Sequence, residues 1–117
     1  MRSILVIEDD WGVNDVLTAA FADAGYVATS ARTVAEAIQL IDGQHFDLIV
    51  ADLMLPDGNA SELIPLAQAH GTKILIVSGH GEHRQRLDEL GVPFVFKPFR
   101  LAQLIDAARR LIASEPK

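Results

Sequence analysis

Side chains that could do phosphate or metal chemistry follow apolar runs of the sequence, at the points where buried strands would end. They are Glu8, Asp9 and Asp10 after Ser3–Ile7, Asp52 after Leu48–Ala51, Ser78 after Lys73–Val77, and Lys97 after Phe94–Phe96. A buried carboxylate without a partner is unfavourable, so the acid at Asp52 in particular needs an explanation. Ligands of open α/β sheets bind at the carboxyl ends of the strands. The spacing therefore predicts one site at one sheet edge.

Such a site would favour a divalent cation and phosphate. The clustered acids repel one another unless a cation joins them. Oxygen ligands, in a chain without cysteine, favour Mg²⁺ or a similar ion such as Mn²⁺. Mg²⁺ usually keeps several waters and leaves room for phosphate oxygens. With Asp52 as a nucleophile and Lys97 neutralising charge, the expected chemistry is phosphoryl transfer.

Helical patterns separate these apolar runs. Apolar residues recur at helical spacing from Val13 to Ala24, and Thr33 with Glu36 has the spacing of a capping box before a stripe that includes Ile38. A third helix carries Pro65, which must kink it or lie near its start. The last helix, over 101–112, has the clearest amphipathic pattern. Strand and helix alternate throughout, which predicts an α/β fold with a parallel sheet covered on both faces.

Composition narrows the function classes. The chain has 117 residues, the size of one domain, with a net charge of −6 and no cysteine. The acidic balance argues against direct binding of nucleic acid. No apolar run approaches the length of a membrane span or a signal peptide. We expect a single domain over 1–117, located in the cytoplasm, without a membrane partner and without an output domain in this chain.

The motifs taken together resemble the receiver domain of two-component response regulators, the CheY-like superfamily. The resembling segments are Ile4–Asp10, Asp47–Gly58, Ile74–Gly79 and Lys97–Phe99, in the right order along nearly the whole chain. The resemblance implies a flavodoxin-like, doubly wound, five-stranded parallel sheet of order 2-1-3-4-5 with helices on both faces. It also implies a cis peptide bond between Lys97 and Pro98.

The resemblance also assigns roles to individual residues. Asp52 would accept a phosphoryl group from a sensor histidine kinase, a phosphotransfer protein or a small donor such as acetyl phosphate. Asp9, Asp52 and the backbone carbonyl of Met54 would ligate Mg²⁺ or Mn²⁺, and Glu8 would act through a metal-bound water. Ser78 and Lys97 would contact the phosphoryl group. Asp10 is interpreted as a solvated acid.

The sequence departs from the family along the route by which the signal would leave. Phe94, three residues before Lys97, stands where the family often has tyrosine, and it offers no hydroxyl. The stretch 84–90 predicts a short or mobile fourth helix. Met54 and His80 lie at positions that tune water access to the acyl phosphate in receivers, and we expect Met54 to shield it partly. The four histidines match no metal-binding spacing.

Two other functions compete with a phosphorylation switch. A Mg²⁺-dependent phosphohydrolase with an aspartate nucleophile would need a second acid two residues after Asp52, where Met54 stands. A pseudo-receiver, an interaction module that works without phosphorylation, would predict the loss of acidic or lysine positions. Those positions are all present, so the altered aromatic residue and fourth helix keep this alternative open only for the way the signal leaves the domain. We expect a switch that changes the surface formed by the fourth helix, fifth strand and last helix, including Phe99, Arg100 and Gln103.

Overall fold

In the computed structural model, residues 2–79 and 88–113 are described. They include a five-stranded sheet in which every neighbouring pair of strands is parallel. Its order is β2 (Val27–Ala31), β1 (Ser3–Ile7), β3 (Leu48–Asp52), β6 (Lys73–Ser78) and β7 (Phe94–Phe96). This order confirms the expected 2-1-3-4-5 arrangement.

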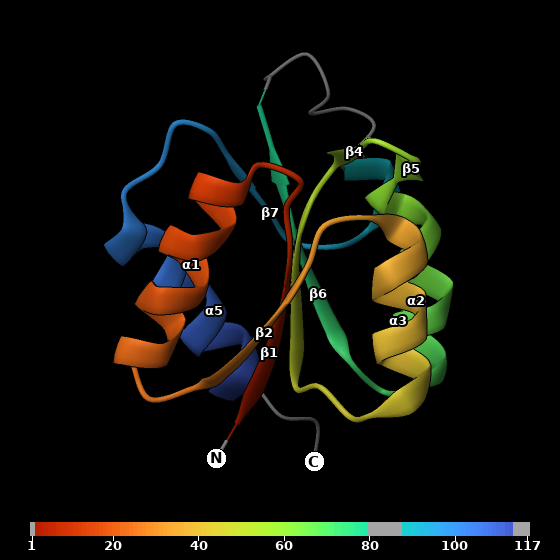
Figure 1. The fold of residues 1–117 in the computed structure, drawn as a ribbon, viewed down its shortest axis with the longest axis horizontal. Helices are drawn as coiled ribbons and strands as arrows, with labels where there is room; N and C mark the ends of the chain where they lie inside the picture. Colours follow the sequence, from red (N-terminus) through yellow and green to blue (C-terminus); the bar gives the residue numbers. More distant parts are fainter. Residues whose placement is uncertain (1, 80–87, 114–117) are drawn as a thin grey trace.

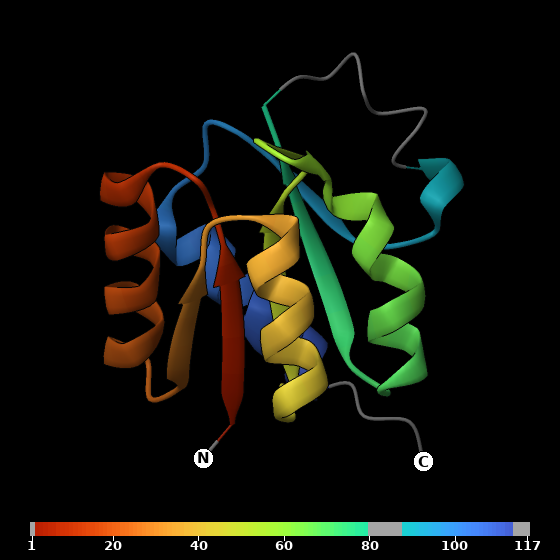
Figure 2. The same cartoon turned by 45° about the vertical axis from the view of Figure 1, so that its right-hand side comes forward.

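Helices cover both faces of the sheet (Figure 1). Helices α1 (Trp11–Asp23) and α5 (Leu101–Ala113) lie on one face, and α2 (Val34–Gly43) and α3 (Ile64–Ala69) lie on the other. Figure 2 shows α2 and α3 side by side in front of the sheet. Two apolar clusters form the core, one between the sheet and each helix pair. Phe21 of α1 is fully buried in one cluster, and Leu63, directly before α3, is fully buried in the other. The inner strands are apolar on both faces for this reason.

Side-chain caps fix where the first two helices begin. Asp10 is the N-cap of α1, and its carboxylate accepts a hydrogen bond from the Val13 N–H at 3.0 Å. The interpretation of Asp10 as merely a solvated acid was therefore incomplete. Thr33 caps α2 as predicted, but the Glu36 carboxylate accepts from the Arg32 N–H rather than from its N-cap. Ile38, expected on the buried stripe, is 39% exposed.

The segment after Asp52 is more structured than the sequence indicated. Strands β4 (Met54–Leu55) and β5 (Gly58–Asn59) form a short antiparallel hairpin. A capping box between Asn59 and Glu62 then starts the 3₁₀ helix η1 (Ala60–Leu63). Pro65 lies in the first turn of α3, where its missing N–H removes no helical hydrogen bond. Of the two alternatives for Pro65, a position near the helix start is the one observed.

The fourth helix falls mostly outside the described residues. Residues 88–90 are helical, and Gly91 follows them with a positive φ of 71°. The expectation of a short or mobile fourth helix stays a prediction, as does the expectation about His80. Across the described ranges, no helix is both long and apolar enough to cross a membrane.

Candidate functional site

The strands deliver the polar residues to one edge of the sheet. Glu8 follows β1 directly, Asp52 and Ser78 are the last residues of β3 and β6, and Lys97 follows β7. Because all five strands run parallel, these four residues lie at the same end. Two backbone hydrogen bonds join the strand ends, from Leu53 N–H to the Val77 carbonyl and from Lys97 N–H to the Ser78 carbonyl. The predicted convergence is therefore present.

Three carboxylates form a compact cluster at this edge. One ligand oxygen each from Glu8, Asp9 and Asp52 lies within 4.8 Å of the other two. Glu8 is only 3% exposed. Burial is the main cause of the raised pKa of the Glu8 carboxyl, and the acidic groups of Asp9 and Asp52 raise it further. The Asp10 N–H and the Lys97 amine lower this pKa, but they do not cancel the rise. A cluster of oxygen ligands whose negative charges repel one another fits a hard divalent cation such as Mg²⁺.

Lys97 supplies the positive charge within the cluster. Its Nζ lies 3.2 Å from Asp52 Oδ2 and 3.3 Å from Glu8 Oε1, so one amine bridges two acids. Burial works against the charged amine, but the carboxylates of Asp52 and Glu8 outweigh it and raise the pKa of Lys97. Lys97 thus stays protonated throughout the physiological pH range. The peptide bond to Pro98 is cis, as the resemblance implied.

Ser78 presents a buried hydroxyl that has no partner. The residue is 1% exposed, and its Oγ makes no hydrogen bond within the described part of the chain. A buried hydroxyl without a partner is costly and rare in folded proteins. Ser78 ends the strand that pairs with β3, where Asp52 pairs with Val77. A ligand oxygen at the acidic edge would satisfy this hydroxyl.

The Asp52 side chain is 15% exposed, and each of its carboxylate oxygens has a polar neighbour. Met54 N–H donates to Asp52 Oδ1 at a long 3.4 Å, while Lys97 holds the other oxygen. The Met54 side chain is 61% exposed, and its sulfur lies 3.8 Å from Asn59 Nδ2. The site therefore has a carboxylate held by both oxygens at an accessible edge, beside an ammonium group and further carboxylates.

Two residues at this edge were missed by sequence reasoning. Asn14 is 1% exposed on α1, and its amide donates to the carbonyls of Glu8 and Ala31 while accepting from Ser30. Arg32, which follows β2, donates two hydrogen bonds to the Asp9 carbonyl. Nothing in the spacing of either residue indicates these contacts. Asn14 interrupts the apolar pattern of its helix, and that was the one available signal.

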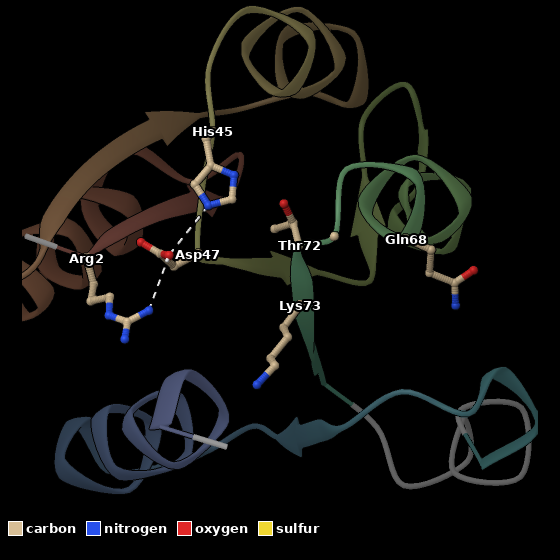
Figure 3. A pocket seen from close by; sticks show the side chains of 7 residues that line it. Arg2, His45, Asp47, Gln68, Thr72 and Lys73 are labelled. Carbon is tan, nitrogen blue, oxygen red and sulfur yellow. Dashed lines mark ion pairs between the residues drawn. The ribbon is translucent and has the colours of Figure 1, made fainter. Parts of the chain in front are cut away.

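A separate cavity of about 380 Å³ lies at the opposite edge of the sheet (Figure 3). Its charged groups already have protein partners. Arg2 and His45 pair with Asp47 at 3.6 and 3.5 Å, and Lys73 Nζ donates to the Leu111 carbonyl. The reactive groups of the acidic edge are absent from the residues that line it, which are Arg2, His45, Asp47, Gln68, Gly71, Thr72 and Lys73. This cavity is not the candidate site.

The fold and the acidic edge together define a class of signalling domain, the receiver domains. Comparison with known families agrees, because residues 4–109 match the family model described as "Response regulator receiver domain". The chain therefore belongs to the response regulator receiver domain family of two-component systems.

Individual relatives agree with this assignment. The chain is 32% identical over 114 residues to the probable transcriptional regulatory protein SilR of Salmonella typhimurium, and the match covers 93% of this chain and 50% of that protein. It is 34% identical to the DNA-binding transcriptional regulator NtrC of Rhizobium meliloti, covering 98% of this chain and 25% of that protein. The chain spans about half the length of SilR.

Solved structures of receiver domains superpose closely. The non-phosphorylated receiver domain of HemR from Leptospira biflexa matches with a TM-score of 0.87 and 31% identity, covering 100% of this chain and 98% of that one. A response regulator receiver protein from Sinorhizobium medicae matches with a TM-score of 0.88 and 25% identity, covering 97% and 95% of the two chains. The likeness extends over the whole fold described above.

Proposed function

We propose that this chain is a phosphorylation switch in which Asp52 accepts a phosphoryl group from the phosphohistidine of a sensor histidine kinase or a phosphotransfer protein. The observation that carries the proposal is the set of groups around Asp52. Lys97 pairs with one of its oxygens, and Glu8 and Asp9 complete an acidic cluster around it. Ser78 has a buried hydroxyl without a hydrogen-bond partner among the described residues.

In the proposed reaction an oxygen of Asp52 attacks phosphorus as the bond between phosphorus and the donor imidazole breaks. The imidazole leaves with the electron pair of that bond and takes up a proton, and an acyl phosphate forms on Asp52. Lys97 then transfers its ion pair from the Asp52 carboxylate to a phosphoryl oxygen. The Ser78 hydroxyl donates to another phosphoryl oxygen and gains the partner it lacks. The switch needs no substrate other than the phosphoryl donor.

A divalent cation, Mg²⁺ or Mn²⁺, fits the acidic cluster and would neutralise charge on the phosphoryl oxygens. Asp9, Asp52 and the Met54 carbonyl would hold it directly, and Glu8 would act through a bound water. The chain's own part is to gather one carboxylate oxygen each from Glu8, Asp9 and Asp52 within 4.8 Å of one another. The Lys97 amine pairs with both Glu8 and Asp52 and so reduces the repulsion between these two carboxylates.

The surface next to the site suits a protein donor. A cavity of about 540 Å³ borders Lys97 and is otherwise lined by Val13, Gly79, Pro98 and Phe99. This open apolar surface gives a donor protein a place to contact beside the reacting atoms. We further propose that phosphorylation changes partner binding at the surface that includes Phe99, Arg100 and Gln103, and that residues 1–117 act as one cytoplasmic receiver domain.

Trp11 fluorescence tests the proposal, because Trp11 begins α1 two residues after Asp9. Addition of Mg²⁺ and then beryllofluoride, a phosphoryl mimic, should change the emission of the wild-type protein in two steps. Asp52→Asn should abolish the beryllofluoride step, whereas Asp106→Asn, an exposed acid on α5, should leave both steps intact. A beryllofluoride response that survives in Asp52→Asn would contradict the assignment.

A further inference from the structure

Arg32 makes an unusual set of contacts beside the acidic edge. Its Nε and a terminal nitrogen donate to the same acceptor, the Asp9 carbonyl oxygen, at 3.2 and 2.9 Å. Its guanidinium carbon lies 3.9 Å from the centre of the Trp11 ring. Within the described residues, Arg32 forms no ion pair, and the nearest acid in the sequence, Glu36, instead accepts a hydrogen bond from the Arg32 backbone N–H. An arginine that makes these contacts instead of an ion pair is placed to hold the backbone of Asp9.

The contact also explains an exposed tryptophan. Trp11 is 64% exposed, which is unusual for a large aromatic residue without a role in the core. Its ring forms the surface against which the Arg32 guanidinium lies. The stacking fixes the plane of the guanidinium fork, so less conformational entropy is lost for each hydrogen bond it makes. Trp11 and Arg32 therefore act as a pair that joins the start of α1 to the end of β2.

The peptide unit between Asp9 and Asp10 connects Arg32 to the reactive groups through hydrogen bonds on both of its sides. Its carbonyl accepts from Arg32, and its N–H, contributed by Asp10, donates to Glu8 Oε2 at 3.0 Å. The other oxygen of Glu8 pairs with Lys97, which in turn pairs with Asp52. One continuous chain of hydrogen bonds thus runs from Arg32 to the phosphoacceptor. Hydrogen bonds in such chains polarise and strengthen one another.

We propose that Arg32 is a positioning residue for the cation and phosphoryl site, acting through the peptide between Asp9 and Asp10 on Asp9 and Glu8. This inference rests on the proposed function, since it assigns Arg32 to the same site. The loop after β1 is held at its peptide by Arg32 and Glu8 and at its side chain by the cap that Asp10 places on α1. Without Arg32, the first of these restraints is lost.

Whether replacing Arg32 weakens or tightens metal binding distinguishes a positioning role from a purely electrostatic one. Removing a positive charge near a cation site would by itself tighten cation binding. Loss of positioning weakens it, and removal of an outer partner of a metal ligand typically weakens affinity by about tenfold or more. We therefore expect Arg32→Gln to weaken Mn²⁺ binding by about tenfold. Titrations followed by the EPR signal of free Mn²⁺ measure the affinity directly.

Matched variants make the test decisive. Arg32→Lys keeps the charge but lacks the fork, so it should weaken Mn²⁺ binding by less than Arg32→Gln does. Trp11→Leu should also weaken binding, because it removes the surface that orients the guanidinium. Arg109→Gln removes the same charge from an exposed position on α5 and should leave the affinity unchanged. If Arg32→Gln does not fold, the comparison of Arg32→Lys with wild type decides the question.

The route through Glu8 has its own test. If Arg32 acts partly on Glu8, the effect of Arg32→Gln on Mn²⁺ affinity should be smaller in a Glu8→Gln background than in wild type, since coupled residues are not additive. Additive effects would overturn this route. Folded Arg32→Gln protein that binds Mn²⁺ as tightly as wild type would overturn the positioning role. Wild-type protein that binds no Mn²⁺ would instead contradict the proposed metal site itself.

Discussion

Replacing Asp52, the proposed phosphoacceptor, should make the metal-free protein more stable. Asp52→Asn removes one charge from three carboxylates whose ligand oxygens lie within 4.8 Å of one another. At an effective dielectric constant of about 20, each of the two repulsions costs at least about 3.5 kcal/mol, because no pair is farther apart than 4.8 Å. The attraction lost to Lys97, at 3.2 Å, is worth about 5 kcal/mol at the same dielectric constant. The balance favours the variant by about 2 kcal/mol.

Urea unfolding in EDTA, followed by circular dichroism, measures this difference. A gain of about 2 kcal/mol raises the melting temperature by roughly 5 to 10 °C in a domain of this size. Saturating Mg²⁺ should narrow the gap, because it stabilises only the protein that binds it, by about 1.4 kcal/mol at ten times Kd. Asp106→Asn, which removes an exposed acid that pairs with Arg109 at 3.8 Å, is the control for net charge.

A stability difference of the opposite sign would contradict this prediction. If Asp52→Asn were less stable than wild type in EDTA by about 1 kcal/mol or more, with the control unchanged, the attraction between Asp52 and Lys97 would outweigh the repulsion among the carboxylates. The ion pair with Lys97 would then be a stabilising element of the fold. The cluster would no longer fit a site held ready for a cation.

Further substitutions test other parts of the account. Ser78→Ala should raise the unfolding free energy by about 1 kcal/mol while slowing phosphorylation, because it removes a buried hydroxyl without a partner. Asn14→Ala should lower the unfolding free energy in urea by about 2 to 4 kcal/mol, since it removes three hydrogen bonds from a buried site. Met54→Asn should shorten the lifetime of the acyl phosphate, measured as loss of the phosphorylated mass over time, and an unchanged lifetime would exclude shielding by Met54. The carboxylate of Asp57 accepts hydrogen bonds from the Val34 and Ala35 N–H groups, and these bonds are the main cause of its lowered pKa. Its contribution to folding stability is therefore present above the ordinary pKa of 3.8 and is lost as the pH falls through the lower pKa of the folded state. Unfolding curves of wild type and Asp57→Asn should differ at neutral pH and converge in acid.

The sequence predicted those features that depend on local pattern. Apolar runs and helical spacing gave the order of the elements, and the parallel arrangement then brought Glu8, Asp52, Ser78 and Lys97 to one edge. That inference needed only the rule that parallel strands end at the same side. The N-cap role of Asp10 could also have been found, since an aspartate directly before a helical run is a common cap.

Contacts between distant loops could not be predicted from the pattern. Asp57 caps α2 across 22 or more residues of sequence, and Arg32 reaches Asp9 across 23. Both contacts depend on how closely neighbouring loops approach once the sheet has formed. Similarly, Phe94 and Phe96 both pack toward α2 and α3, with ring centres 5.2 Å apart. This follows from strand alternation, but the face they occupy was fixed only by the tertiary structure.

Intact mass spectrometry shows directly whether Asp52 accepts a phosphoryl group. The protein is incubated with Mg²⁺ and acetyl phosphate, and its mass is compared with that of Asp52→Asn and Asp57→Asn treated in the same way. We expect the addition of one phosphoryl group to wild type and Asp57→Asn, none to Asp52→Asn, and none to any variant in EDTA. Persistent modification of Asp52→Asn, or full modification in EDTA, would contradict this expectation.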